Sequence, residues 1–279
     1  MLTSRLPVAA AGSTLDHELQ VAIQLARDAG AVLRSRQMAQ IEIWRKGRGE
    51  IVTPADLASN EIICRGLSKE FPGDTVCSEE GPPVASGSVR TWFVDPLDST
   101  SNYVQCGNEY SVSIGLAING EAVLGVVYNP ARDELFTGCI GKGVFCNGIR
   151  AEGVDRQALR QLTILVSSKE WKHSLNRLGG SMSVRPMASM AYKMARVASG
   201  KEDAVFSLKT RKPWGTCAGT ALVLAAGGLV TTIQSEPLVF DCRGPRTFDG
   251  LVAARRSLHP GILVLALGLR PHLGQERGA

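Results

Sequence analysis

The chain has 279 residues, a formal net charge of +5, and 44% apolar and 20% charged residues. This length is enough to bury a large core, either as one domain or as two halves. The charge is small for the length and no dense lysine and arginine block is present, which argues against a nucleic-acid polymer as partner. The apolar run at 262–269 is far too short to span a membrane.

The seven cysteines are scattered singly and form no Cys-x-x-Cys pair. An odd number without such pairs argues against a disulfide framework or a zinc site. The brief apolar stretch at residues 6–11 is too weak for a signal peptide. The expected location is therefore the reducing cytoplasm.

The first half of the chain predicts two helices followed by a run of strands. After a flexible start at residues 1–12, Ser13 or Thr14 can cap a helix with apolar residues at helical spacing from 15 to 33. The Thr53-Pro54 pair marks the start of a second helix that runs toward Leu67. Asn119-Gly120 predicts a two-residue hairpin turn. The expected strands are 41–44, 76–78, a run ending at 95, 111–118, 122–128 and 134–140.

The second half of the chain changes in pattern near residue 153, where strands and helices begin to alternate. The expected strands are 162–166, 183–186, 204–207 and 229–233, and the expected helices are 168–178, 189–198 and 217–226. A meander followed by alternation predicts two subdomains with the site between them. These are an N-terminal α+β subdomain at 13–152 and a C-terminal α/β subdomain at 153–267, with a tail at 268–279.

Asp95 and Asp98 stand three residues apart on a proline-bent turn that follows an apolar stretch. Carboxylates at the end of a buried strand are unfavourable unless a cation lies between them. The hydroxyl-rich segment 99–101 can offer backbone N–H groups to an anion. A cation on one side and a bound anion on the other are typical of a site for a phosphate ester. The alternative interpretation is an ordinary Asp-Pro turn with an Asx cap.

Asp56 and Glu79 extend this acidic set, because each also stands at a predicted helix start or strand end. Oxygen donors without a His or Cys cluster favour Mg²⁺ over zinc. Taken singly, each acid is more often a solvated or capping residue, so only the combination predicts a metal site. The four histidines are far apart and support no Ser-His or Cys-His mechanism.

Five segments of the chain, in order between residues 15 and 257, resemble the inositol monophosphatase superfamily. They are Val52-Thr53-Pro54-Ala55-Asp56, Glu79-Glu80, Asp95-Pro96-Leu97-Asp98-Ser99-Thr100-Ser101-Asn102-Tyr103, Gly141-Lys142-Gly143-Val144-Phe145-Cys146-Asn147-Gly148 and Pro213-Trp214-Gly215-Thr216-Cys217-Ala218-Gly219. The resemblance implies an α/β protein with a layered αβαβα fold that forms a homodimer. It also implies Mg²⁺-dependent hydrolysis of phosphate monoesters, with Mn²⁺ as a possible substitute and Li⁺ as an inhibitor.

The resemblance also implies roles for individual residues. The metal ligands would be Glu79, Asp95, Asp98 and the carbonyl of Leu97. The residues that orient the attacking water would be Asp56 and Thr100, and the backbone amides that bind phosphate would be those of Ser99 and Thr100.

Two residues depart from the family pattern. Ser99 stands where the family has glycine, and its Cβ is disfavoured if the turn needs a positive φ. Gly215 stands where the family's Trp-Asp motif supplies a carboxylate to a second metal. The loss of this carboxylate should weaken the binding of the second metal. Glu202 and Asp203 are the acids that could compensate.

The substrate is less well defined than the chemistry. Residues 141–148 resemble inositol phosphatases, whereas 107–112 and 188–193 resemble the 3′(2′),5′-bisphosphate nucleotidase branch. Candidate ligands for substrate phosphate are Lys193, Lys209 and Arg211, and solvated surface charges are the alternative interpretation. The sequence predicts a phosphomonoesterase for an inositol or sugar monophosphate. A bisphosphate nucleotidase is one alternative, and a catalytically impaired relative that binds phosphorylated ligands is the other.

Overall fold

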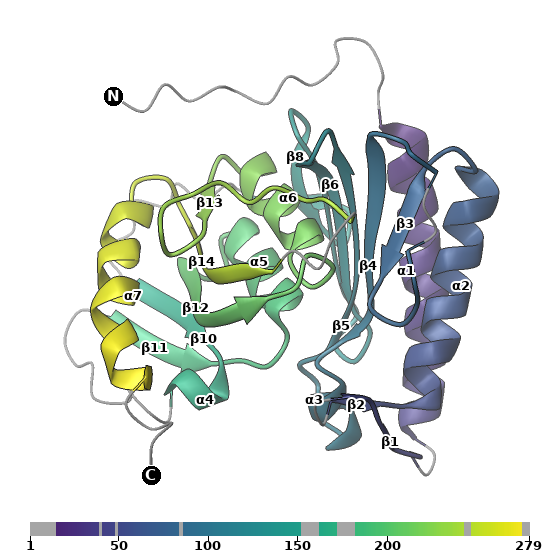
Figure 1. Ribbon diagram of the computed structural model, residues 1–279, viewed down its shortest axis with the longest axis horizontal. Helices are drawn as coiled ribbons and strands as arrows, with labels where there is room; N and C mark the ends of the chain where they lie inside the picture. Colours follow the sequence, from purple (N-terminus) through teal and green to yellow (C-terminus); the bar gives the residue numbers. More distant parts are fainter. Residues whose placement is uncertain are drawn as a thin grey trace.

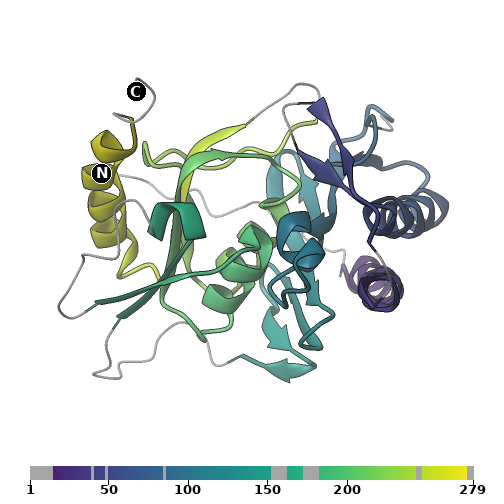
Figure 2. The same ribbon diagram turned by 90° about the horizontal axis from the view of Figure 1, so that it is seen from below.

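The structure is a computed structural model that describes residues 15–38, 41–47, 50–83, 86–151, 162–171, 182–242 and 247–274. Two large sheets alternate with three layers of helices, as Figure 1 shows and the view from below in Figure 2 supports. The layers follow one another as helices, sheet, helices, sheet and helix, so the predicted layered αβαβα architecture is confirmed. Among the described helices, none combines the length and apolar character needed to cross a membrane.

The first sheet is a seven-stranded meander in which only the first pair of strands is parallel. The turn between its third and fourth strands is the predicted Asn119-Gly120 hairpin, and both residues have positive φ. In order, the strands are β3 (Thr75–Ser78), β4 (Arg90–Asp98), β5 (Ser111–Ile118), β6 (Glu121–Asn129), β7 (Glu134–Cys139), β8 (Gly143–Cys146) and β9 (Ile149–Arg150).

Helices α1 (Asp16–Gln37) and α2 (Pro54–Glu70) cover one face of this sheet (Figure 1). The start of α2 is as predicted, with Thr53 as N-cap and Pro54 in the first turn. The start of α1 differs, because Leu15 is its N-cap and makes no side-chain capping bond. Ser13 and Thr14, the predicted caps, lie outside the described residues.

The second sheet has five strands in the order β11, β10, β12, β14, β13. Helices α5 (Met190–Ala198) and α6 (Cys217–Ala225) pack between the two sheets, and α7 (His259–Gly274) covers the outer face. The strands are β10 (Leu162–Val166), β11 (Met182–Pro186), β12 (Ala204–Arg211), β13 (Leu229–Thr231) and β14 (Phe248–Ala254). The boundary expected near residue 153 stays a prediction, because residues 152–161 lie outside the described part of the chain.

Several predicted elements have different bounds in the structure. The strand predicted at 41–44 is reduced to β1 (Trp44–Arg45), because only these residues find partners in β2 (Ile51–Val52). The helix predicted at 168–178 is described only as the short α4 (Ser168–Glu170), and residues 172–181 are not described. Strand β12 continues to Arg211, because beyond a bulge after Ser207 it still pairs with β14.

Six elements were not predicted at all: β2, α3 (Thr100–Val104), β8, β9, β14 and α7. Helix α7 continues to Gly274, beyond residue 267 where the tail was expected. Its sequence contains proline and several glycines, which are poor helix formers, and its apolar face is supported by β12 and β14. Tertiary packing therefore overrides the local propensity here.

Glycines allow α6 to approach the first sheet closely. A Cβ on Gly115 would lie 2.5 Å from the backbone nitrogen of Ala218, and a Cβ on Gly125 would overlap the Ala218 carbonyl. Both contacts are with backbone, which cannot rotate away. The segment that precedes α6 carries Trp214 and Gly215, so this packing also sets their position.

Gly125→Ala is expected to destabilise the protein by about 3 kcal/mol or more, because the added methyl group forces the sheet and α6 apart. The measurement is the free energy of unfolding from urea denaturation. Gly261→Ala in α7 is the matched control: a Cβ there meets no described atom within 4 Å, so we expect a gain of up to about 1 kcal/mol. An unchanged free energy for Gly125→Ala would contradict the packing described.

Candidate active site

The sequence motif around Asp95 lies at the C-terminal end of β4. The pairing of β4 with β5 is interrupted between Asp95 and Asp98, and Pro96, which lacks an N–H donor, falls inside this irregularity. Asp95 and Leu97 are buried, with 4% and 2% of their surface exposed, whereas Asp98 is partly exposed. The irregularity therefore carries two carboxylates from a buried strand toward the region between the sheets.

Asp95 and Glu79 come from neighbouring parallel strands, and their carboxyl groups interact directly. Glu79 follows β3, and its backbone N–H donates to the Val94 carbonyl at 3.1 Å. The Asp95 Oδ1 atom is buried and has no hydrogen-bond partner among the described residues. A buried carboxylate oxygen without a hydrogen-bond partner is energetically unfavourable unless a hydrogen-bond donor or a cation contacts it.

Burial and mutual repulsion hold protons on these acids in the metal-free protein. Burial raises the pKa of Glu79 to about 7, and the negative charges of Glu80 and Asp98 add to this against the opposing charge of Lys46. Burial raises the pKa of Asp95 well above its ordinary range, with further contributions from Glu79, Asp98 and Asp56. Lys46 itself is paired with Glu80.

Asp56 and Thr100 form a second part of the site. The Thr100 hydroxyl donates to Asp56 Oδ1 at 2.9 Å, although the Leu97 carbonyl at 3.3 Å is within its reach. Asp56 Oδ2 accepts bonds from the backbone N–H and the hydroxyl of Thr53, at 2.8 and 2.6 Å. This is the capping box of α2, so the helix start holds the Asp56 carboxylate in one orientation.

Ser99 has φ +81°, which places it in the left-handed region, and it precedes the short helix α3 (Thr100–Val104). The turn thus requires a positive φ at the position where the resemblance expects glycine, so the strain anticipated for the Ser99 Cβ is present. A non-glycine residue in this region carries a penalty of about 1 kcal/mol or more.

Ser99→Gly is expected to stabilise the protein by about 0.5–1 kcal/mol, because relief of this strain exceeds the added entropy of the unfolded chain. The measurement is the urea midpoint together with the slope of the transition. Ser101→Gly is the matched control, since Ser101 lies inside α3 and glycine there should destabilise. A loss of stability in Ser99→Gly would contradict the strained turn.

Asp98 is bound to the start of α5. Its Oδ2 atom accepts the Ser189 hydroxyl at 2.6 Å and the Ala191 N–H at 2.7 Å. Burial raises the pKa of Asp98, and these two bonds and the charges of Lys193 and Arg211 oppose the rise. Ser189 was not among the predicted site residues; its place as the N-cap of a predicted helix is the signal that could have found it.

The three predicted phosphate ligands have different environments. Lys193 is fully buried, with 0% exposure, and its ammonium group donates to the Met187 carbonyl at 3.0 Å. Burial, reinforced by the Arg211 charge, lowers the pKa of Lys193 to about 7. The Arg211 Nε atom donates to the Ser207 hydroxyl at 2.8 Å, and Lys209 is exposed on β12. The interpretation of Lys193 as a solvated surface charge is therefore wrong.

Gly215 lies next to the acidic cluster, and a Cβ at this position would lie 3.3 Å from Asp95 Oδ2. The two acids expected to compensate for it are engaged elsewhere. Glu202 accepts bonds from Arg185 at 2.5 Å and Arg196 at 2.9 Å. Asp203 accepts bonds from Arg255 and from the Thr163 N–H, both at 2.9 Å. Compensation by these residues is excluded while these bonds persist.

The candidate ligands of a divalent cation are a small group of oxygen atoms around Asp95. In the part of the chain that the structure describes, no group of three or more His, Cys, Asp or Glu side chains could hold a metal ion. A cation there would therefore draw on a pair of carboxylates, Glu79 and Asp95, and on the Leu97 carbonyl. The unpartnered Asp95 oxygen is the atom that such a cation would satisfy.

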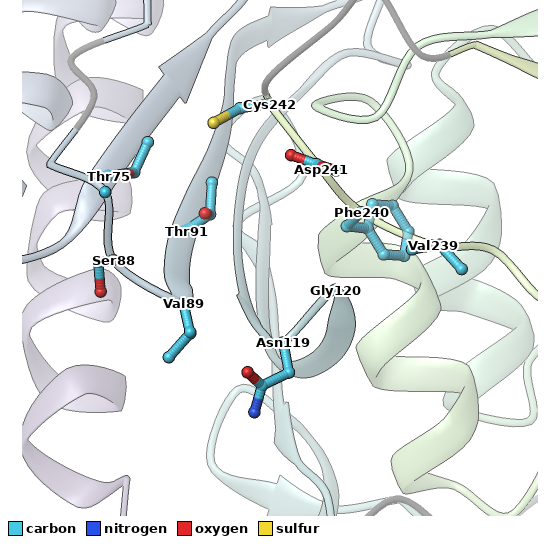
Figure 3. A pocket seen from close by; sticks show the side chains of 11 residues that line it. Thr75, Ser88, Val89, Thr91, Asn119, Gly120, Val239, Phe240, Asp241 and Cys242 are labelled. Carbon is cyan, nitrogen blue, oxygen red and sulfur yellow. The ribbon is translucent and has the colours of Figure 1, made fainter.

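Two hollows lie beside the segment 239–242. One, of about 250 Å³, reaches Glu79 and is lined by Cys77, Ser78, Glu79, Gly81, Pro83, Lys212, Pro213, Trp214, Asp241 and Cys242. The other, of about 440 Å³, is shown in Figure 3 between the starts of β3 and β4 and the side chains of Val239 and Phe240. Its lining includes none of the predicted site residues, so only the smaller hollow adjoins the candidate site.

Comparison with known proteins assigns the family. The model described as "Inositol monophosphatase family" matches residues 14–266. The chain belongs to the inositol monophosphatase family. It is 34% identical to inositol monophosphatase 2 of Solanum lycopersicum, over 77% of this chain and 87% of that relative.

Two further similarities support membership of the inositol monophosphatase family. The chain is 34% identical to Nus factor SuhB of Salmonella typhimurium, over 76% of this chain and 84% of that protein. The structure of inositol monophosphatase from Anabaena superposes with a TM-score of 0.76 at 29% identity, covering 94% of this chain and all of that one. Membership supports a phosphatase that acts on small phosphate substrates.

Proposed function

We propose that the protein is a metal-dependent phosphomonoesterase that hydrolyses an inositol or sugar monophosphate. The observation that carries this proposal is the unpartnered Asp95 oxygen, buried among acids that repel one another in the absence of a cation. Such a cluster destabilises a fold and is expected where a cation compensates for it. Family membership supports the same class of reaction.

The proposed cofactor is Mg²⁺, with Mn²⁺ as a substitute and Li⁺ as an inhibitor. Its proposed ligands are Glu79, Asp95 and the Leu97 carbonyl, with Asp98 beside them. When bound, such a cation supplies Lewis acidity toward a phosphoryl oxygen and acidifies a water molecule.

The remaining steps belong to the chain's own residues. Asp56 accepts a hydrogen bond from the Thr100 hydroxyl, which leaves the Thr100 oxygen free to accept a hydrogen bond from the attacking water and so to orient it. The backbone amides of Ser99 and Thr100 stand at the start of α3, where N–H groups have no partner within the helix and can bind phosphate. Lys209 and Arg211 are proposed to attract the substrate, and Lys193 acts from within the protein.

The test is a phosphate-release screen over inositol phosphates, sugar phosphates and adenosine 3′,5′-bisphosphate, with Mg²⁺ and Mn²⁺ compared. We expect the fastest release from an inositol or sugar monophosphate. A preference for the bisphosphate would favour a nucleotidase, although the burial of Lys193 argues against direct contact with a second phosphate. Release from none of these esters would overturn the proposal.

A second candidate function is favoured by Gly215, which replaces a carboxylate of the family motif. In this alternative the protein binds phosphorylated ligands without turning them over. Binding of an inositol phosphate, measured calorimetrically, together with no phosphate release, would support it.

We further propose that the protein works in the cytoplasm as a homodimer and has no nucleic-acid polymer or membrane as partner. The seven cysteines are scattered singly along the sequence without a Cys-x-x-Cys pair, as expected in a reducing compartment. The dimer rests on the family resemblance alone, and analytical ultracentrifugation would test it.

A further inference from the structure

Two cations would find unequal sets of donors around Asp95. On one side, Glu79, Asp95 and the Leu97 carbonyl come together at the ends of β3 and β4. On the other side are Asp95 and Asp98, and Gly215 supplies no carboxylate at the point where a Cβ would lie 3.3 Å from Asp95 Oδ2. A second cation would therefore have two carboxylates at most.

Asp98 is also less available than its position in the sequence suggests. Its Oδ2 atom already accepts two short hydrogen bonds, from the Ser189 hydroxyl and the Ala191 N–H. The Ser189 hydroxyl is fixed in turn by Ser111 at 3.0 Å and by the Tyr192 N–H at 3.0 Å. Asp98 thus connects β4 with the start of α5, and one of its oxygens remains for a cation.

The charges of two protein cations act on Asp98. Lys193 is one turn further along α5 than Ser189, is fully buried, and its charge acts on Asp98. Arg211, at the end of β12, acts on the same carboxylate. Glu170 and Glu109 also face Lys193, but Glu170 is held by the Leu208 N–H at 2.7 Å and Glu109 by the Ala188 N–H at 3.0 Å.

We propose that the site binds a single divalent cation per chain, at Glu79, Asp95 and the Leu97 carbonyl, and that Lys193 and Arg211 take the place of a second cation beside Asp98. The inference rests on the proposed function, which requires the first cation. The absence of a carboxylate at Gly215 and the presence of two positive side chains, the buried Lys193 and the partly buried Arg211, then belong to one arrangement. A like charge whose field reaches the site of a divalent ion weakens the binding of that ion.

The first experiment counts cations by titrating the metal-free full chain with Mn²⁺ alone and measuring free Mn²⁺ by electron paramagnetic resonance. We expect one Mn²⁺ per chain for the natural sequence and two for Gly215→Asp. Gly215→Asn is the matched control, because it adds a side chain of similar size without the charge, and should bind one. Two ions in the natural sequence would overturn this inference and leave the proposed function standing. No bound ion in the natural sequence would overturn both.

The second experiment tests the two protein cations in the background of Gly215→Asp. Adding Lys193→Met should tighten the second Mn²⁺ by about fivefold or more, because a buried like charge is removed. Arg211→Met should act in the same direction and serves where the Lys193 variant fails to fold. Lys69→Met removes an exposed charge from the last turn of α2, to which no role in the site is given, and should leave the affinity unchanged. An unchanged or weaker second site in both Lys193→Met and Arg211→Met would overturn the role given to these residues.

Discussion

Asp95→Asn is expected to lower phosphate release by at least about 1000-fold, which corresponds to about 4 kcal/mol in the barrier. Asp95 contacts Glu79, lies beside Gly215 and experiences the charges of Asp98 and Asp56, so it is the centre of the acidic cluster. Asparagine keeps the shape but replaces one oxygen by an NH₂ group, which cannot bind a cation. The measurement is the rate of release at saturating Mg²⁺ with the best ester of the screen.

The same substitution is expected to stabilise the metal-free protein near neutral pH. A carboxyl group whose pKa is raised in the folded state stabilises the fold below its unfolded pKa and loses this contribution as the pH rises through its folded pKa. The contribution of Glu79 is lost between about pH 4.5 and about pH 7, and the pKa of Asp95 is shifted in the same direction. In EDTA, the melting temperature of the natural protein should therefore fall from pH 5 to pH 8, and that of Asp95→Asn should fall less.

Asp28→Asn provides the matched control for both measurements. Asp28 is exposed on α1, far along the chain from the cluster, and the change should alter neither the rate nor the pH dependence of stability. Retention of more than a tenth of the activity by Asp95→Asn would contradict a central role for this carboxylate. A steeper fall of stability with pH in the variant would contradict the repulsion described.

The parts of the site that could be predicted from the sequence are those encoded over a few residues. The Thr53-Pro54 start of α2 is local, and it brings Asp56 into the capping box. The spacing of Asp95 and Asp98 is also local, and the irregular end of β4 follows from Pro96 between them. In each case, neighbouring residues supply both the backbone geometry and the polar group.

The parts that could not be predicted depend on contacts between distant segments. Ser189 meets Asp98 across 91 positions of the chain, and Asp203 meets Arg255 across 52. The burial of Lys193 arises because α5 lies between two sheets, which no local pattern of charges reveals. Likewise β14 joins the second sheet between β12 and β13, although it is the last of the three in the sequence.

Thr100→Val and Asp56→Asn are each expected to lower phosphate release by about 100-fold, and the double variant is expected to lose little more than the worse single variant. The Thr100 hydroxyl and Asp56 Oδ1 are 2.9 Å apart and act on the same water in the proposed reaction. Once one partner is lost, the other has nothing to orient, so the losses do not add. The measurement is a double-mutant cycle on the rate at saturating substrate.

Thr100→Ser is the control for this cycle, because it keeps the hydroxyl and should retain most of the activity. The structure also separates orientation from folding: Asp56 is held by Thr53 through its other oxygen, so Thr100→Val leaves the capping box of α2 intact. Its free energy of unfolding should therefore change much less than its rate. Losses that multiply in the double variant would show that Asp56 and Thr100 act independently, and would remove the basis for assigning them a common water.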